Sequence, residues 1–410
     1  MVGYFTRERF GRPQFLAALL LLAFLAQALW LVHVELSVAQ GMDGDEEIRI
    51  AEGLKQWRGR GVAGAPVIDP VDNPFAQLSQ SSENGFDREH SPLLSVVSAA
   101  PLLAWPHDLN AETATYWRWL PRIPFLACGA FLGASLWYVA RRLCGNTGGF
   151  IALTFYAFSP AFIQSAAAWH TEPHIVAAWG AFGAIFTAIA VAHTLYAPRE
   201  VVLWNWRRIV LLGIALAIAI GSQFSLVILI PMALGFLLYV APVRRRAGVV
   251  IWLAACAVSF LLLLATYFFH LHAFAASIRH AQFWGFVGQA FGTIGIYKQV
   301  GRQIGSACPA FVIALPVTVA TYSLWRRTRY FGNTGPLLVA VLFIVLAIAN
   351  PHSFTGFVLA SIPFLFVFVA GVLADLLETS YRPVILGSVL ALLITYAART
   401  LLALAQVPRG

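Results

Sequence analysis

An acidic cluster, Asp43-Gly44-Asp45-Glu46-Glu47, lies just beyond the first long apolar run of the chain. This position corresponds to the edge of a bilayer. A carboxylate there is able to take a proton from an acceptor hydroxyl while the hydroxyl oxygen attacks an electrophile. A solvated acidic face without a chemical role is the alternative interpretation. The residue types alone leave both open.

A second group of polar residues is His170-Thr171-Glu172-Pro173-His174, between two apolar runs. Glu172 would bring a second carboxylate near the first, together with two imidazoles. His170 and His174 have the i, i+4 spacing that suits a metal on one continuous helix, but Pro173 interrupts a helix there. The group is also not an HExxH motif. A polar turn without a metal is the simpler alternative, so metal binding stays open.

Several cations form a third set, on the side of the membrane that is otherwise poor in positive charge. Its members are Arg118, Arg122, Arg279, Lys298, Arg302 and His352. Any one of them is explained by snorkelling of its charge to lipid headgroups. As a set they would suit a phosphate, which Arg grips through two hydrogen bonds. Arg122, between Pro121 and Pro124, stands out because a charge facing lipid is costly and so should point into the protein.

These residues must be positioned by membrane-spanning helices. Of the 410 residues, 60% are hydrophobic and 11% are charged, and the mean hydropathy is +0.75. A soluble domain is about one-quarter charged, so soluble enzymes, disordered chains and disulfide scaffolds are excluded. The net charge of +9 fits basic cytoplasmic loops rather than nucleic-acid binding. The four Cys have no CxxC spacing, so neither a zinc site nor a disulfide framework is indicated.

Apolar runs of the length that crosses a bilayer predict an all-α, polytopic transmembrane helical bundle of about eleven spans. The runs are 14–38, 119–140, 149–168, 174–196, 208–222, 224–241, 248–270, 306–324, 335–350, 354–376 and 384–404. The block 208–241 reads as two short helices broken at Gly221-Ser222-Gln223, with one long tilted helix as the alternative. The first run is expected to be an uncleaved signal anchor, and a cleaved signal peptide is the alternative.

The distribution of charge predicts the orientation. With the N-terminus in the cytoplasm, the cytoplasmic segments hold 15 of the 27 Lys and Arg residues. The opposite connections are poor in basic residues, as the positive-inside rule requires. The C-terminus is then expected outside, and the cations and acidic cluster described above lie on the extracytoplasmic face.

Two long outer loops interrupt a chain that otherwise forms a single transmembrane domain. The first, 39–118, holds 12 of the 18 acidic residues. In it, 46–57 has the apolar spacing of a helix that lies on the membrane surface, and 91–105 is expected to be a second short helix with Pro92 near its start. The second outer loop, 271–305, is rich in aromatic residues, which favour the headgroup zone.

The order of several motifs resembles the GT-C superfamily of polytopic membrane glycosyltransferases. They are DGDEEIRIAEGL (43–54), HSPLLSVVSAAPLLAW (90–105), RWLPRIPFLACGAFLGASLWYVARRLCG (118–145), GGFIALTFYAFSPAFIQSAAAWHTEPH (148–174) and, more loosely, NPHSFTGFVLASIPFLFVFVAGVL (350–373). The chain is most similar to the bacterial branch that groups with aminoarabinose transferases and protein mannosyltransferases.

The resemblance implies a sugar donor linked to a polyprenyl phosphate, used on the periplasmic face of a bacterial inner (plasma) membrane. The family's base maps onto Asp45 and Glu46, with Asp43 as the alternative. Its histidine segment maps onto His90, and its arginine at the second span maps onto Arg122. The turn that often holds Asp in relatives has Glu172 flanked by His170 and His174. The late Arg-Tyr segment of relatives is replaced here by His352-Ser353-Phe354.

Together these features predict a single inverting displacement at the sugar. Asp45 would accept the proton, and Arg122, Lys298 and Arg302 would hold the departing phosphate. The scheme requires no cofactor, and a divalent metal at Glu172 stays open. The acceptor is left as a lipid, a glycan or a protein of the cell envelope. A transporter or lipid flippase is the alternative function, but it predicts charges in mid-membrane and paired discontinuous helices, and the sequence shows neither.

Overall fold

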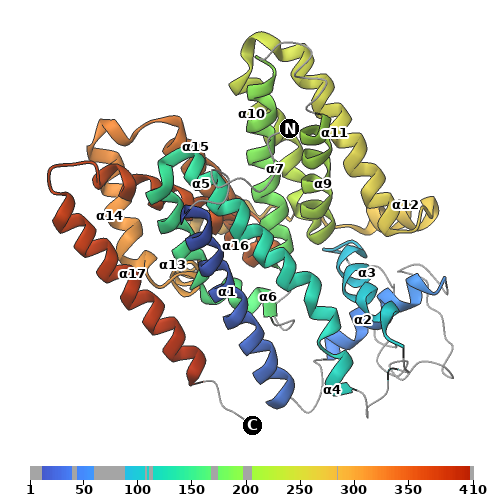
Figure 1. The fold of residues 1–410 in the computed structure, drawn as a ribbon. Coiled ribbons are helices and arrows are strands. Elements are labelled where there is room, and N and C mark those ends of the chain that lie inside the picture. Colours follow the sequence, from blue (N-terminus) through green and yellow to red (C-terminus); the bar gives the residue numbers. More distant parts are fainter. Residues whose placement is uncertain are drawn as a thin grey trace, which may run out of the picture. The chain divides into compact units, whose positions relative to one another are not determined.

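The computed structural model describes residues 12–38, 44–59, 88–106, 109, 114–167, 174–196, 206–283 and 285–406. Every regular element in these ranges is a helix (Figure 1), which confirms the predicted all-α class. The chain forms two compact units. Unit 1 contains Met1–Val38, Leu126–Ala168 and Val287–Gly410, and unit 2 contains Ala39–Phe125 and Trp169–Phe286. The expectation of a single transmembrane domain stays a prediction.

The α-helices of unit 1 are mostly long and apolar. They are α1 (Arg12–Val38), most of α5 (Ile123–Ala157), α6 (Pro160–Ala167), α13 (Ile294–Ala307), α14 (Phe311–Leu324), α15 (Phe331–Ala349), α16 (Phe354–Leu376) and α17 (Arg382–Ala405), with the short 3-10 helices η6 (Gly288–Gly292), η7 (Arg326–Thr328) and η8 (Pro351–Ser353) between them. Helix α5 consists of two helices that meet at Cys144 and Gly145. Gly145 has a φ of 72°, which only glycine adopts without strain.

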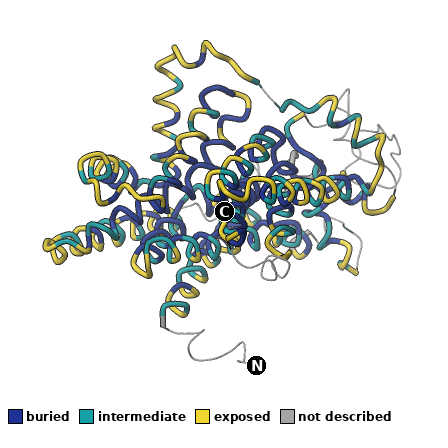
Figure 2. The backbone as a smooth tube through the Cα atoms, turned by 90° about the horizontal axis from the view of Figure 1, so that it is seen from above, coloured by how far each residue is buried: buried dark blue, intermediate teal, exposed yellow. Residues whose placement is uncertain are grey.

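Helix α16 is the centre of unit 1, and it is buried over almost its whole length. Its Phe366 stacks against Phe155 of α5 at 6.2 Å between ring centroids and also contacts Phe162 and Phe311. By contrast, α17 is mostly exposed, as expected of a helix that faces lipid. Figure 2 shows the same pattern, with buried turns inside the helix clusters and exposed turns along their margins.

The end of α5 shows how unit 1 satisfies its backbone. The helix stops at Ala157, so its last carbonyl groups lose their helical partners. Side chains from two other helices replace them. Gln27 Nε2 of α1 donates to Ala157 O at 3.0 Å, while Tyr396 Oη and Thr400 Oγ1 of α17 donate to Phe155 O at 3.1 Å and to Phe158 O at 3.0 Å. Such bonds matter because lipid offers no substitute.

Unit 2 combines a helical bundle with short helices from the segment 39–118, which the sequence predicts to be the first outer loop. The bundle contains α7 (His174–Thr194), α9 (Trp206–Ser222), η4 (Phe224–Ile228), α10 (Leu229–Val240), η5 (Pro242–Arg244) and α11 (Arg245–Thr266), and α12 (Leu271–His280) follows. The other helices are α2 (Gly44–Trp57), α3 (Leu93–Ala99), η2 (Ala100–Ala104), α4 (Ala114–Trp117) and η3 (Leu120–Arg122).

Helices α7, α9 and α11 lie side by side in Figure 1, and small residues allow them to pack closely. A Cβ on Gly180 of α7 would lie only 2.5 Å from the backbone nitrogen of Ala219 in α9, and one on Gly213 of α9 would lie 2.6 Å from Val258 of α11. Close backbone approach at small residues is the usual way in which membrane helices associate.

All eleven predicted apolar runs contain helix, but fewer helices are long enough to span. Within the described residues, seven are long and apolar enough to cross a membrane, or eight if α13 and α14, bent by 110°, count as one span. The chain is therefore a multi-pass membrane protein, and the count of eleven stays a prediction. The block 208–241 is two helices, α9 and α10, separated at Gln223, as the first of the two alternatives states.

Candidate functional site

Helix α2 carries most of the acidic cluster that follows the first apolar run, namely Asp45, Glu46 and Glu47. Its apolar residues Ile50 and Leu54 are buried in a cluster with Ala99, Leu102 and Trp117. The sequence predicts a helix with this face on the membrane surface. The helix is confirmed. The predicted contact of this face with lipid is wrong, because residues of α3, η2 and α4 cover Ile50 and Leu54.

Two further contacts fix the distance between α2 and α3. A Cβ on Gly53 would collide with the carbonyl oxygen of Ser95, so only glycine allows the two helices to approach this closely. Trp57, in the last turn of α2, donates from Nε1 to Val96 O at 2.9 Å, and its ring meets Phe268 edge-on at 5.1 Å. The position of α2 within unit 2 is therefore determined at its middle and at its C-terminal end.

A buried ion pair determines the N-terminal end of the same helix. Arg122 Nε donates to Glu46 Oε1 at 3.1 Å, and Nη2 donates to Oε2 at 3.0 Å. The two side chains are 4% and 1% exposed. The structure thus brings two predicted site residues together, but each binds the other. A carboxylate held by both oxygens is a poor proton acceptor, and a guanidinium so engaged has fewer donors for a phosphate.

Asp45 immediately precedes Glu46 in the first turn of α2. Its backbone belongs to the helix, whereas its side chain lies outside the described part of the structure, so its role as the base stays a prediction. Asp43, His170 and Glu172 also lie outside the described residues. His174 begins α7 and is half-buried. Among the described residues, no three His, Cys, Asp or Glu side chains form a group able to hold a metal.

His90 belongs to a buried junction of unit 2. The adjacent Ser91 binds Gly221 O twice, with its backbone nitrogen at 3.0 Å and its hydroxyl at 2.8 Å, and Phe224 N donates to Glu89 O at 2.8 Å. Both His90 and Ser91 are buried. The histidine segment therefore packs on the break between α9 and η4, which gives it a structural function that the sequence did not indicate.

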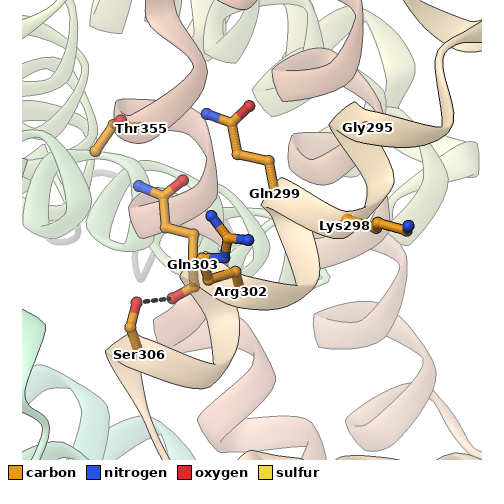
Figure 3. A pocket seen from close by; sticks show the side chains of 7 residues that line it. All are labelled: Gly295, Lys298, Gln299, Arg302, Gln303, Ser306 and Thr355. Atoms are coloured by element: carbon orange, nitrogen blue, oxygen red, sulfur yellow. Dashed lines mark hydrogen bonds between the residues drawn. The ribbon is translucent and has the colours of Figure 1, made fainter.

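The cations Lys298 and Arg302 lie in unit 1, on the polar face of α13. They line an open pocket of about 560 Å³ together with Gly295, Gln299, Gln303, Ser306 and Thr355 (Figure 3). Figure 3 shows Arg302 beside Gln299, which lies three residues earlier on the same face of the helix, and Gln303, which follows it in the chain, while Lys298 extends away from them. Both cations are exposed to solvent.

The predicted site residue His352 precedes a residue of the pocket wall, Thr355, by three positions in the chain. It is exposed in η8, and Thr355 lies in the first turn of α16. The structure therefore brings two predicted site residues, Lys298 and Arg302, into one pocket, whereas His352 does not line it.

Four polar residues of the pocket were missed by the sequence analysis, namely Gln299, Gln303, Ser306 and Thr355. The signal for the first three is their helical spacing around Lys298 and Arg302, with the buried residues Val300 and Ile304 on the opposite face. That signal is visible only if 294–307 is read as a helix. We expected a loop over 271–305, whereas the structure has α12, η6 and α13 there.

Comparisons with protein-family models and with curated protein sequences found no match. Solved structures do match. ArnT from Cupriavidus metallidurans bound to undecaprenyl phosphate has a TM-score of 0.57 and 15% identity, over 93% of this chain and 64% of that chain. Its apo form gives a TM-score of 0.55, with 16% identity over 90% and 61% of the two chains.

A second kind of protein with a similar structure is the archaeal oligosaccharyltransferase AglB from Archaeoglobus fulgidus, in complex with an inhibitory peptide and a dolichol-phosphate. It has a TM-score of 0.52 and 12% identity, over 96% of this chain and 56% of that chain. This chain thus spans less than two thirds of the length of either protein. The chain shares the fold of ArnT and AglB, and this agrees with the GT-C-like helical bundle that its motifs predict.

Proposed function

We propose that this protein is an inverting glycosyltransferase that uses a sugar donor linked to a polyprenyl phosphate. The observation that carries the proposal is the pocket on α13, which presents Lys298 and Arg302 to solvent. Two cations on one helical face suit a phosphate, and the volume of the pocket lies within the ordinary range for a small-molecule site. The GT-C fold adds support, because solved proteins with this fold bind undecaprenyl phosphate or dolichol-phosphate.

The surroundings of the pocket suit a donor with a lipid chain. Ile294 and Tyr297 are exposed on the same helix, and Phe291 is exposed in η6 just before it. These apolar side chains would lie against lipid, while Arg302 and Gln303 would bind the polar end of the donor. Gln299 and Gln303 carry amides that both donate and accept, as the hydroxyl groups of a sugar require.

The proposed reaction is one displacement at the anomeric carbon. The acceptor oxygen attacks this carbon, and its proton passes to the Asp45 carboxylate. The bond between the anomeric carbon and the phosphate oxygen breaks, and its electron pair stays on the phosphate, which Arg302 and Lys298 neutralise. The configuration inverts because only one displacement occurs. This scheme needs no cofactor from outside the chain.

The acceptor is proposed to be a lipid, glycan or protein on the extracytoplasmic face of a bacterial inner membrane. Mass spectrometry of envelope glycans and glycolipids, from cells with and without the protein, would identify the transferred sugar. A sugar modification that depends on the protein supports the proposal. Unchanged envelope glycans and glycolipids, together with movement of a lipid-linked sugar across the membrane of vesicles that contain the purified protein, would instead indicate a transporter.

The Arg302→Ala variant tests the pocket directly. We expect it to weaken binding of undecaprenyl phosphate to protein in nanodiscs by about tenfold or more, because a charge-assisted hydrogen bond contributes roughly 1.5–3 kcal/mol. Arg399→Ala is the matched control, since Arg399 is exposed in α17 of the same unit and does not line the pocket. Equal affinity of the two variants would remove the pocket from the donor site.

A further inference from the structure

We infer that Glu46 and Arg122 form a positioning pair, which holds in one position the first turn of α2, the turn that carries the proposed base Asp45. This inference rests on the proposed function, because it assumes that Asp45 is the base. The sequence predicted Glu46 as a second candidate for the base and Arg122 as a phosphate ligand. The inference replaces both roles with a positioning role. The basis is the contact between the two residues, with two hydrogen bonds of 3.0–3.1 Å and both side chains buried.

The location of the pair explains why α2 needs it. The first turn of a helix lacks part of its backbone hydrogen bonding and tends to fray. Asp45 lies in that turn, one residue after the helix begins at Gly44. Gly53 and Trp57 hold the middle and the end of α2, but neither restrains its beginning. The contact between Glu46 and Arg122 supplies that restraint.

The pair also sets the rotation of the helix about its axis. Glu46, Ile50 and Leu54 recur every four residues and are all buried, so they define the inward face of α2. Consecutive residues of an α-helix are about 100° apart around the axis. The backbone at position 45 therefore lies about 100° from the direction that Glu46 fixes. A loss of the ion pair would free this angle as well as the first turn.

Arg122 is well suited to act as the fixed partner. It is the last residue of η3, and α5 continues directly from Ile123. The pair therefore connects the short helix α2 to the start of the long apolar helix α5. An isolated buried ion pair is weak evidence for added stability, and its best-supported use is to select one geometry. A constraint on the geometry of the base is a use of that kind.

The test compares Glu46→Gln and Arg122→Lys with matched changes at exposed positions. Glu52→Gln and Arg58→Lys repeat the same chemical changes on or beside α2, where both side chains are exposed. We expect Glu46→Gln and Arg122→Lys to lower kcat by about 10–100-fold, because a misplacement near 1 Å has costs of this order. The KM for the donor should stay within about twofold, and both controls should keep wild-type kinetics.

Hydrogen exchange of the folded protein provides a readout that does not depend on turnover. The amides of residues 48–51, whose hydrogen bonds close the first turn of α2, should exchange faster in both variants, and exchange near Gly53 should not change. The reversed pair, Glu46→Arg with Arg122→Glu, should recover part of the lost kcat. A donor KM raised more than tenfold by Arg122→Lys, with kcat unchanged, would overturn the inference and make Arg122 a phosphate ligand. Unchanged kcat in both single variants would also overturn it.

The same experiments separate this inference from the proposed function. If the wild-type protein and Asp45→Asn show equal transfer, the base assignment fails, and the inference that depends on it fails as well. If Asp45→Asn abolishes transfer while Glu46→Gln and Arg122→Lys behave as wild type in kinetics and in exchange, only the positioning pair fails.

Discussion

At the scale of single residues, the proposed chemistry depends most on the carboxylate of Asp45. Asn has nearly the same shape but does not accept a proton, so Asp45→Asn should lower the rate of sugar transfer by about 10²–10⁴-fold. Donor binding should persist, because the cationic pocket is formed by α13. The measurement is transfer by purified protein in nanodiscs, alongside titration with undecaprenyl phosphate. Wild-type turnover in this variant would show that another group is the base.

The sequence indicated which residue types matter here, but it did not show their partners. The Asp45-Glu46 pair and Arg122 were recognised from charge, position and family motifs. Their separation of 76 residues hides the fact that Glu46 and Arg122 bind each other. The pairing depends on how α2 packs against α3, η2 and α4, and no local pattern encodes that packing. Lys298 and Arg302 were easier to associate with each other, because they lie only four residues apart in the chain.

At the scale of helices, the contact between α2 and α3 makes a prediction about Gly53. Alanine favours a helix by about 0.5–1 kcal/mol over glycine, yet the new Cβ would collide with Ser95 O. Such overpacking costs about 1–3 kcal/mol, so Gly53→Ala should lower the thermal stability of the protein. Gly235→Ala in α10 is the control, because nothing lies within 4 Å of its Cβ position. Equal melting temperatures of the two variants would contradict the prediction.

The last turn of α5 makes a second prediction at this scale. Tyr396→Phe and Thr400→Val each remove a hydroxyl that donates to a carbonyl of residues 155–158. Each change should destabilise the protein by about 0.6–1.5 kcal/mol, which is the usual range for such bonds within membranes. Thr321→Val should cost less, because its hydroxyl is exposed and bonds only within its own helix. Thermal unfolding in detergent would rank the three variants.

Apolar runs predicted where the helices lie. They did not predict a helix end at which the sequence stays apolar. The run 149–168 contains the end of α5, a break at residues 158–159 and α6, although its hydropathy is continuous. The break lies at Ser159-Pro160, because proline has no N–H to continue the helix. Side chains from elsewhere, including Thr400, satisfy the carbonyl groups released there. The polar helix α13 was missed for the opposite reason, since its composition is that of a loop.

At the scale of the whole molecule, unit 1 separates its basic loops from its pocket. The start of α15, just after η7, lies beside the end of α16, just before α17. Two contacts join these ends. Arg327 pairs with Glu378 at 2.6 Å, and Asn333 Nδ2 donates to Asp375 Oδ2 at 2.8 Å. The opposite ends of α15 and α16 meet at η8, beside the wall of the pocket on α13. The pocket and the arginine-rich loop therefore lie at opposite ends of this helix pair.

This arrangement predicts which end faces the cytoplasm. Because basic loops stay inside, the η7 end should be cytoplasmic and the pocket extracytoplasmic. In a variant with its four Cys replaced by Ser, single cysteines would be introduced by Gly292→Cys in η6 and by Ser380→Cys between α16 and α17, at positions that are both exposed. A membrane-impermeant maleimide should label only the first in intact spheroplasts and both after lysis. Labelling of the second alone would invert the orientation and place the cationic pocket on the cytoplasmic side, where the proposed extracytoplasmic acceptor does not reach it.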